Sequence, residues 1–116
     1  WCLGAKEAAQ PAAGDLAAAA TDCDCGASPG QCTIDGEQQT VASSSFPGIT
    51  LTSPASSLTF DGRLGMRSDA DIADANASSF DLTSASGRYT LTVSVSPLGQ
   101  ASVCSKSGTI LGYPSC

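Results

Sequence analysis

The sequence predicts one small domain of mainly antiparallel β-structure that is held together by disulfide bonds. Its 116 residues have the length of a single domain. Several short runs after residue 40 alternate between apolar and polar side chains, which is the pattern of a half-buried strand. Six cysteines accompany an aromatic content of only 5%, so large core-filling side chains are scarce and cross-links would add needed stability. We therefore expect a cysteine-rich loop region over residues 1–40 and an antiparallel β region over residues 41–116.

Residues 5–20 are rich in alanine, which favours helix, but Pro11 and Gly14 interrupt the run. No apolar stripe recurs there at helical spacing. We expect at most a short helical turn over Asp15–Ala20, with Asp15 as its N-cap. The segment is best interpreted as a surface excursion that the surrounding cysteines close.

The strands are expected over residues 47–53, 56–62, 78–84 and 87–97, where short alternating runs are punctuated by proline and glycine. The last run is the clearest. In it the alternation predicts one apolar face, formed by Tyr89, Leu91, Val93 and Val95. The opposite face would carry Thr90, Thr92, Ser94 and Ser96. One face would pack on a core and the other would meet water or another subunit.

A further alternating run over residues 98–105 follows Pro97–Gln100, whose Gly99 is typical of a hairpin turn. Consecutive strands joined by short turns predict an antiparallel meander.

The cysteines favour disulfides over a metal site. Their number is even, and the chain contains no histidine. The dense group is Cys23-x-Cys25 followed by Cys32, whereas structural zinc sites use pairs spaced by two to four residues together with a second pair or histidines. Disulfides place the protein in an oxidising compartment outside the cytosol. We expect no metal and no cofactor.

Six cysteines allow fifteen pairings, so the connectivity stays open at this point. Proximity along the chain favours Cys104–Cys116. For the other four, Cys2–Cys23 with Cys25–Cys32 is the first choice, and Cys2–Cys25 with Cys23–Cys32 is the second.

An acidic stretch over residues 68–76 contains Asp69, Asp71 and Asp74. An EF-hand loop would also need a central glycine and a terminal glutamate, and both are missing. We therefore interpret this stretch as a solvated loop and leave calcium binding open. Asn76-Ala77-Ser78 is a formal glycosylation sequon.

The charge distribution argues against two classes of partner. The net charge is −6, and the five basic residues are scattered at Lys6, Arg63, Arg67, Arg88 and Lys106. Nucleic acids and anionic lipids are bound by clustered lysine and arginine, so we expect neither partner. No apolar run is long enough to span a membrane, and no signal peptide is visible. Because the chain opens at Trp1, we expect a mature protein or a piece of a longer one.

The sequence offers no catalytic motif. Without histidine, Ser-His and Cys-His activation of a nucleophile are excluded. Neither a G-x-S-x-G sequence nor a phosphate-binding glycine loop appears. Eleven acidic residues could supply a carboxylate pair, but no spacing singles one out. We expect the protein not to be an enzyme and to have no small-molecule substrate.

Several short motifs resemble the globular heads of type IV minor pilins and type II secretion pseudopilins of the GspH/FimT group. The chain opens with "WCLG", continues through "CDC" and "CTIDG", and ends in a cysteine. In that group an F-D-x-x-G strand precedes a strand that ends in V-S-x-x-G-R. The first motif is matched loosely by Phe60, Asp61 and Gly65. The second is matched by Val95, Ser96 and Gly99, with Gln100 in place of the arginine.

The resemblance implies an α+β fold, in which a β-meander sheet packs on a hydrophobic N-terminal helix largely absent from this chain. That helix would precede Trp1, hold the subunit in the bacterial inner membrane and then pack in the core of a filament. Other pilin subunits would be the partners, and the apolar side of residues 89–95 would supply part of the helix contact. The cysteine loop and the acidic loop would lie on the exterior.

Some FimT-like members bind DNA through basic residues near the C-terminal end. Here Gln100 replaces the usual arginine and only Lys106 is basic beyond it, so we do not expect DNA uptake. The expected function is that of a structural subunit, a minor pilin. The alternatives are a type II secretion pseudopilin and a secreted adhesin or carbohydrate-binding module, for which Trp1 and Tyr113 are the candidate aromatic platforms.

Overall fold

The computed structural model describes residues 1–7, 23–26, 31–68 and 77–116. In these ranges the chain is mainly antiparallel β-structure, and its one helix is a single 3-10 turn, η1 (Ser43–Ser45). The predicted predominance of antiparallel strands is thus confirmed. The chain divides into two compact units, Trp1–Phe46 and Pro47–Cys116. The expected helical turn over Asp15–Ala20 and the acidic stretch with Asp69, Asp71 and Asp74 lie outside the described residues, as does Asn76 of the sequon.

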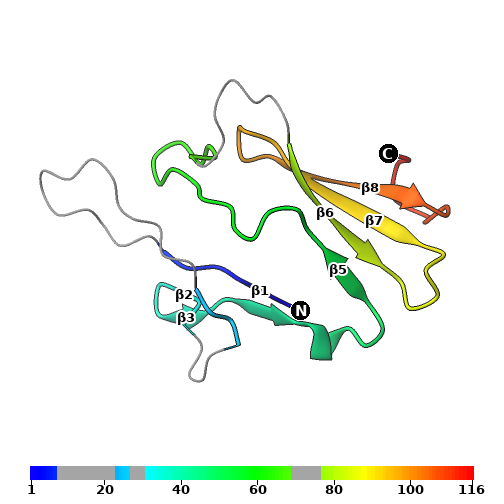
Figure 1. The fold of residues 1–116 in the computed structure, drawn as a ribbon. Helices are drawn as coiled ribbons and strands as arrows, with labels where there is room; N and C mark the ends of the chain where they lie inside the picture. Colours follow the sequence, from blue (N-terminus) through cyan, green and yellow to red (C-terminus); the bar gives the residue numbers. More distant parts are fainter. Residues whose placement is uncertain (8–22, 27–30, 69–76) are drawn as a thin grey trace, which may run out of the picture. The chain divides into compact units, whose positions relative to one another are not determined.

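The first unit is built from two short antiparallel pairs (Figure 1). Strand β1 (Cys2–Gly4) pairs with β4 (Thr40–Ala42), and β2 (Thr33–Ile34) pairs with β3 (Glu37–Gln38). The turn between β2 and β3 is Asp35-Gly36, and both residues have positive φ, at 53° and 78°. Asp-Gly with this backbone is the preferred two-residue hairpin connection. Sequence analysis had assigned most of this unit to loop, so these four strands were missed.

Hydrogen bonds tie the two pairs of the first unit into one body. The amide of Ala5 donates to the carbonyl of Gln39, and the amide of Gln39 donates to the carbonyl of Cys32. At the other end of β1, the amino group of Trp1 lies 3.2 Å from the hydroxyl of Ser43. The ring of Trp1 stacks on that of Phe46, with centroids 6.1 Å apart. The strands in this unit are only two or three residues long. Two disulfides, described below, add covalent links within the unit.

The second unit is a four-stranded antiparallel meander in the order β5-β6-β7-β8 (Figure 1). The strands are β5 (Thr50–Thr52), β6 (Ser78–Thr83), β7 (Thr90–Val95) and β8 (Ala101–Ser107). The meander that the sequence predicts is therefore confirmed. Between β7 and β8, Ser96 and Gln100 are hydrogen-bonded and enclose the turn Pro97-Leu98-Gly99, where Gly99 has φ 76° and its amide donates to the carbonyl of Ser96. This three-residue loop with a final left-handed residue is a common hairpin connection.

One expectation about an individual strand is wrong. Residues 56–62 form no strand, and only Phe60 makes an isolated bridge, to Arg67. The cause is local: the carboxylate of Asp61 accepts hydrogen bonds from the amides of Arg63 and Leu64, which closes a turn instead of extending the chain. Tyr89 lies just before β7 and is 43% exposed, so within the strand the expected apolar face consists of Leu91, Val93 and Val95.

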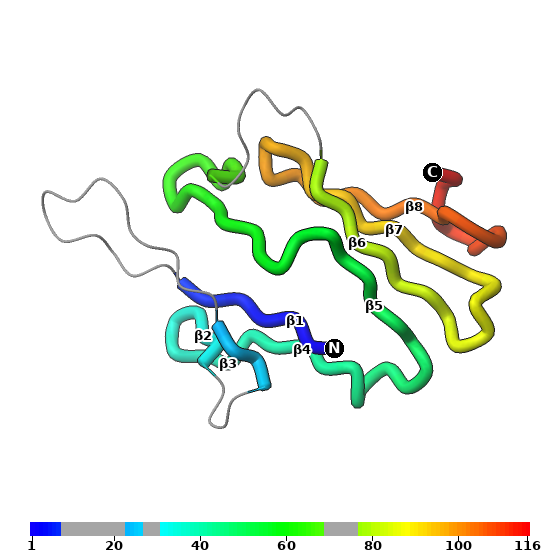
Figure 2. The backbone as a smooth tube through the Cα atoms, viewed as in Figure 1, coloured from blue at the N-terminus to red at the C-terminus, as the bar shows by residue number. Residues whose placement is uncertain are grey.

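The C-terminal residues return alongside β8 (Figure 2). Ser105 on β8 forms a parallel bridge with Ser115, its amide donates to the carbonyl of Pro114, and the amide of Cys116 donates to its carbonyl. The tail thus covers part of the outer edge of β8, an arrangement that blocks pairing with another strand.

Few apolar side chains are deeply buried. Among the described residues only Cys32, with no exposed surface, and Val95, 8% exposed, are buried apolar residues. The scarcity of large side chains had predicted such a sparse core.

Candidate functional site

All six cysteines are joined in three disulfides, Cys2–Cys25, Cys23–Cys32 and Cys104–Cys116. Their Cα atoms are 6.2, 5.1 and 5.1 Å apart, all within the usual range for a disulfide. The structure therefore has the expected C-terminal bridge. It has the second of the two weighed pairings in the first unit, and the first choice is wrong. Each loop closed by one pairing differs by only two residues from the corresponding loop of the other pairing. The entropy of loop closure is therefore nearly the same for both and could not rank them.

The two disulfides of the first unit pack against the backbone of β1. A Cβ atom placed on Gly4 would overlap the sulfur of Cys32 and would lie 2.9 Å from that of Cys23 and 3.0 Å from Cβ of Cys25. Only a residue without a side chain fits here. The sequence alone does not single out Gly4, because the cysteines that leave no room for a side chain there are about twenty to thirty positions away. The cluster is structural: its sulfurs hold β1 against the start of β2.

An apolar face runs across the four strands of the second unit. The register aligns Leu51 with Leu82 and Leu91, and it aligns Phe80 with Val93 and Val103. These six side chains and Val95 therefore lie on one side of the sheet. Val95 is buried, whereas the other six side chains are only half-buried. A β-sheet face of this length stabilises a domain through the apolar area that it removes from water.

The opposite face is polar and carries an ion pair. The carboxylate of Asp81 on β6 accepts a hydrogen bond from the hydroxyl of Thr92 on β7 at 2.7 Å. Its second oxygen lies 2.7 Å from the ammonium group of Lys106 on β8. Lys106, and then Thr92, hold the pKa of Asp81 below its ordinary value. Alternation in residues 78–83 could have placed Asp81 on this face, but nothing in the sequence indicates its partner.

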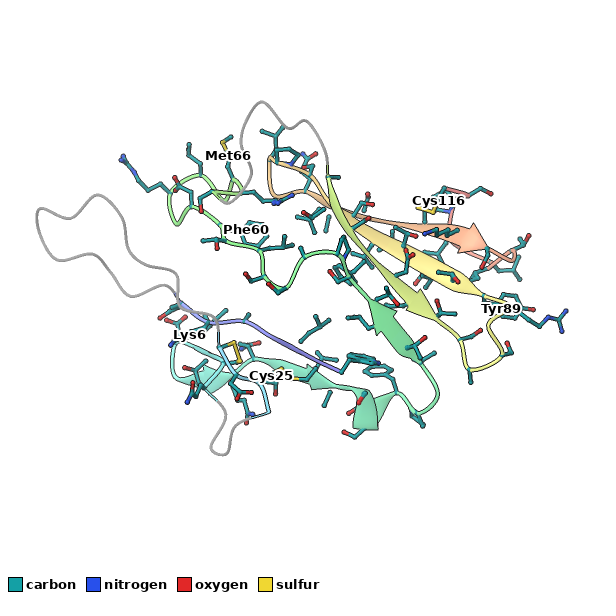
Figure 3. All side chains as sticks on the ribbon, in the orientation of Figure 1. Lys6, Cys25, Phe60, Met66, Tyr89 and Cys116 are labelled. Atoms are coloured by element: carbon teal, nitrogen blue, oxygen red, sulfur yellow. A yellow bond between two sulfur atoms is a disulfide. The ribbon has the colours of Figure 1, made fainter. Side chains whose placement is uncertain are left out.

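The two short motifs quoted above meet in space. The amide of Arg67, in the turn that follows Phe60 and Asp61, donates to the carbonyl of Pro97 at 2.9 Å. A Cβ atom on Gly99 would overlap the carbonyl oxygen of Gly65. The backbones of the two turns are thus in direct contact, and Figure 3 shows Phe60 and Met66 on the first of them.

Backbone donors also stabilise the first of these turns. The carboxylate of Asp61 accepts from the amides of Arg63 and Leu64, and these bonds lower the pKa of Asp61. The turn therefore forms a defined loop on the β7–β8 hairpin. One oxygen of its carboxylate accepts both of these backbone hydrogen bonds.

Other kinds of site find no support in the described ranges. No group of three or more His, Cys, Asp or Glu residues in them could hold a metal ion. Within the same ranges no helix is long and apolar enough to cross a membrane. The surfaces described above are therefore considered as candidate interaction surfaces.

Comparison of the chain with protein-family models, with curated proteins and with solved structures finds no match. The three disulfides indicate an oxidising, extracytoplasmic environment. Function has to be argued from the surfaces described above.

Proposed function

We propose that this chain is the head of a pilin-like structural subunit, a minor pilin of a type IV pilus. The observation that carries the proposal is the apolar face of the four-stranded sheet, of which only Val95 is buried. A sheet face of that kind gains free energy when an amphipathic or apolar helix packs on it. In the proposed subunit, a hydrophobic helix that precedes Trp1 in the longer protein is that element. The pilin-like arrangement of helix and sheet is part of this proposal.

Two further features support the proposal. The turn with Phe60, Asp61 and Gly65 contacts the hairpin with Ser96 and Gly99, so the two motifs that resemble the pilin group form one structural feature. The disulfides suit a protein that works on the periplasmic face of the inner membrane and in an external filament. The partners in this proposal are other pilin subunits. Catalysis, nucleic-acid binding and a small-molecule substrate have no part in it.

The proposal is tested with the full-length gene product in the organism that encodes it. A photo-crosslinking residue at Val93, on the apolar face, should crosslink to the hydrophobic N-terminal segment of the same subunit. The same residue at Ser94, on the polar face, is the matched control and should not. Deletion of the gene should reduce the number of surface filaments. A gene without a hydrophobic segment upstream of Trp1 would refute the proposal.

A type II secretion pseudopilin would have the same head and N-terminal helix but would serve protein secretion instead of a pilus. If deletion of the gene stops enzyme secretion and leaves the pili normal, the pseudopilin alternative is favoured.

A secreted glycan-binding module is the second candidate class. Its support is the polar face, where register aligns Thr50, Thr83 and Thr90 in one row and Ser79, Ser94 and Ser102 in another. Tyr89 and Tyr113, 43% and 45% exposed, could stack on sugar rings. Glycan-array binding that is lost in Tyr113→Ala would favour this class over the pilin.

A further inference from the structure

One end of the sheet exposes apolar and aromatic side chains together with a cation. We call the set Arg88, Tyr89, Leu111 and Tyr113 the sheet-end patch. Leu111 is 93% exposed, Tyr113 45% and Tyr89 43%. Arg88 is also exposed, and its guanidinium forms no ion pair among the described residues. Leu111 and Tyr113 belong to the loop that begins at Gly108, next to Arg88 and Tyr89.

The sheet-end patch is held in a fixed shape. Gly108, with φ 68°, lies against the ring of Tyr89, and a Cβ atom at this position would be 2.6 Å from the ring. From Gly108 the loop runs through Leu111 and Tyr113 and is closed by the Cys104–Cys116 disulfide. Figure 3 shows Tyr89 and Cys116 at this end of the sheet. A surface that is already ordered before binding loses less conformational entropy when a partner docks.

The first unit presents a surface of complementary character. The β2–β3 turn exposes Ile34, 37% exposed, and the carboxylates of Asp35 and Glu37, which have no partner among the described residues. We call this set, Ile34, Asp35 and Glu37, the acidic turn. It too is fixed, since the Cys23–Cys32 disulfide ends directly before β2.

The distribution of charge over the sequence matches these two surfaces. Residues 1–46 carry six of the eleven acidic residues and only one basic residue, Lys6. Residues 77–116 carry Arg88, Lys106 and one acid, Asp81, which is paired with Lys106. Because Asp81 and Lys106 neutralise each other, Arg88 gives residues 77–116 a net charge of +1, and it lies in the sheet-end patch. Opposite charges on the two surfaces favour their association and set its orientation.

We propose that the sheet-end patch of one copy of this chain binds the acidic turn of a second copy. Ile34 would lie among Leu111 and the tyrosines, and Asp35 and Glu37 would pair with Arg88. Because the two surfaces differ, the contact is heterologous, and each copy has one surface of each kind to offer to a neighbour. The proposal rests on the proposed function, which needs contacts of this kind between subunits, and it names the residues that make one of them.

The experiment uses complementary charge variants of the 116-residue chain. Two small surfaces make a weak contact, so sedimentation and amide NMR shifts are measured up to about 1 mM protein. The unaltered chain should associate at low salt and dissociate at about 500 mM NaCl, where charges are screened within about 4–5 Å. Arg88→Glu and the double variant Asp35→Lys/Glu37→Lys should each weaken association about tenfold or more.

Mixing the two variants provides the decisive observation. The Arg88→Glu chain keeps its acidic turn, and the double variant keeps its sheet-end patch, so an equimolar mixture should form 1:1 pairs and nothing larger. Arg63→Glu changes the net charge as Arg88→Glu does but lies in another loop, and it should associate like the unaltered chain.

Three outcomes would overturn the contact. These are no association of the unaltered chain, a mixture that stays monomeric, or equal losses in Arg63→Glu and Arg88→Glu. If the two variants do not pair while gene deletion still reduces the number of surface filaments, the contact is wrong and the proposed function stands. If the mixture pairs but no hydrophobic segment precedes Trp1, the contact stands and the pilin function fails.

Discussion

The ammonium group of Lys106 on β8 reaches over β7 and lies 2.7 Å from a carboxylate oxygen of Asp81 on β6. The pair links two strands that are not hydrogen-bonded neighbours. It is partly exposed, with 59% of the Lys106 side chain and 25% of the Asp81 side chain accessible. An ion pair with this exposure contributes about 1 kcal/mol or less, because water screens it.

Asp81→Asn should therefore lower the free energy of unfolding modestly, by about 1 kcal/mol or less at pH 7. Lys106 lowers the pKa of Asp81 in the folded chain. The ion pair therefore stabilises the fold at pH values above the unfolded pKa of Asp81, about 4. It is lost as pH falls through the folded value. Urea unfolding should show that Asp81→Asn has a lower free energy of unfolding than the unaltered chain at pH 7, and that this difference disappears at about pH 2. Glu37→Gln, which removes a carboxylate that has no ion pair among the described residues, is the control for the loss of one negative charge and should leave the free energy of unfolding at pH 7 nearly unchanged. A difference for Asp81→Asn that persists in acid would contradict the assignment.

The disulfide connectivity has a direct test. An endoproteinase that cuts before aspartate separates Cys23 from Cys25 at Asp24 and leaves Cys25 and Cys32 on one peptide. With Cys2–Cys25 and Cys23–Cys32, the unreduced digest should contain three peptides joined as one species. Mass spectrometry that instead finds the Cys2 and Cys23 peptides joined, without the third, would establish the other pairing.

Gly4→Ala should strongly destabilise the first unit. The added methyl group would overlap the sulfur of Cys32 and press on Cys23, and neither disulfide can move without shifting the backbone. Overpacking of this kind costs about 1–3 kcal/mol. Gly62→Ala is the matched control, since nothing lies within 4 Å of its added methyl group. Urea unfolding followed by Trp1 fluorescence should separate the two variants, and equal stabilities would contradict the packing.

Gly99→Ala should cost more than the strain of its backbone. A left-handed conformation costs an alanine about 1–2 kcal/mol, and here the methyl group would also overlap the carbonyl of Gly65. Gly87→Ala has a similar φ, 70°, with nothing within 4 Å, so it measures the strain alone. A larger loss of unfolding free energy in Gly99→Ala is expected. Equal losses would mean that the two turns are not in contact.

Replacing both Cys104 and Cys116 by serine should remove about 3 kcal/mol of stability, given a loop of this length. The tail would no longer be held on β8, so the amide of Ser105, which donates to Pro114, should exchange its hydrogen faster. Cys2→Ser/Cys25→Ser is the control and should leave that exchange rate unchanged. Protection of Ser105 that survives loss of the bridge would show that hydrogen bonds alone hold the tail.

Sequence reasoning worked best where the physical signal is local. The alternation of Leu91, Val93 and Val95 and the glycine of the Pro97–Gly99 turn are sufficient to identify the β7–β8 hairpin. The approach failed over residues 56–62, where alternation was weak and the Asp61 carboxylate closed a turn. It also missed β1, whose partner β4 is more than thirty residues away and leaves no local pattern.

The candidate surfaces divide in the same way. Alternation alone predicts the apolar face of the sheet. The choice between two disulfide pairings, the contact of Gly4 with sulfur and the reach of Lys106 to Asp81 depend on distances across the fold. Composition and residue spacing do not predict such distances.

The placement of Ser115 beside Ser105 has a consequence for biogenesis. The covered rim of the sheet is held by hydrogen bonds to Ser105 and by the Cys104–Cys116 disulfide. Until a thiol oxidant has acted, a newly exported chain offers its outermost strand to any neighbour with a matching strand. We therefore expect oxidation to protect this strand, and cells lacking the oxidant should accumulate more of this protein as aggregates.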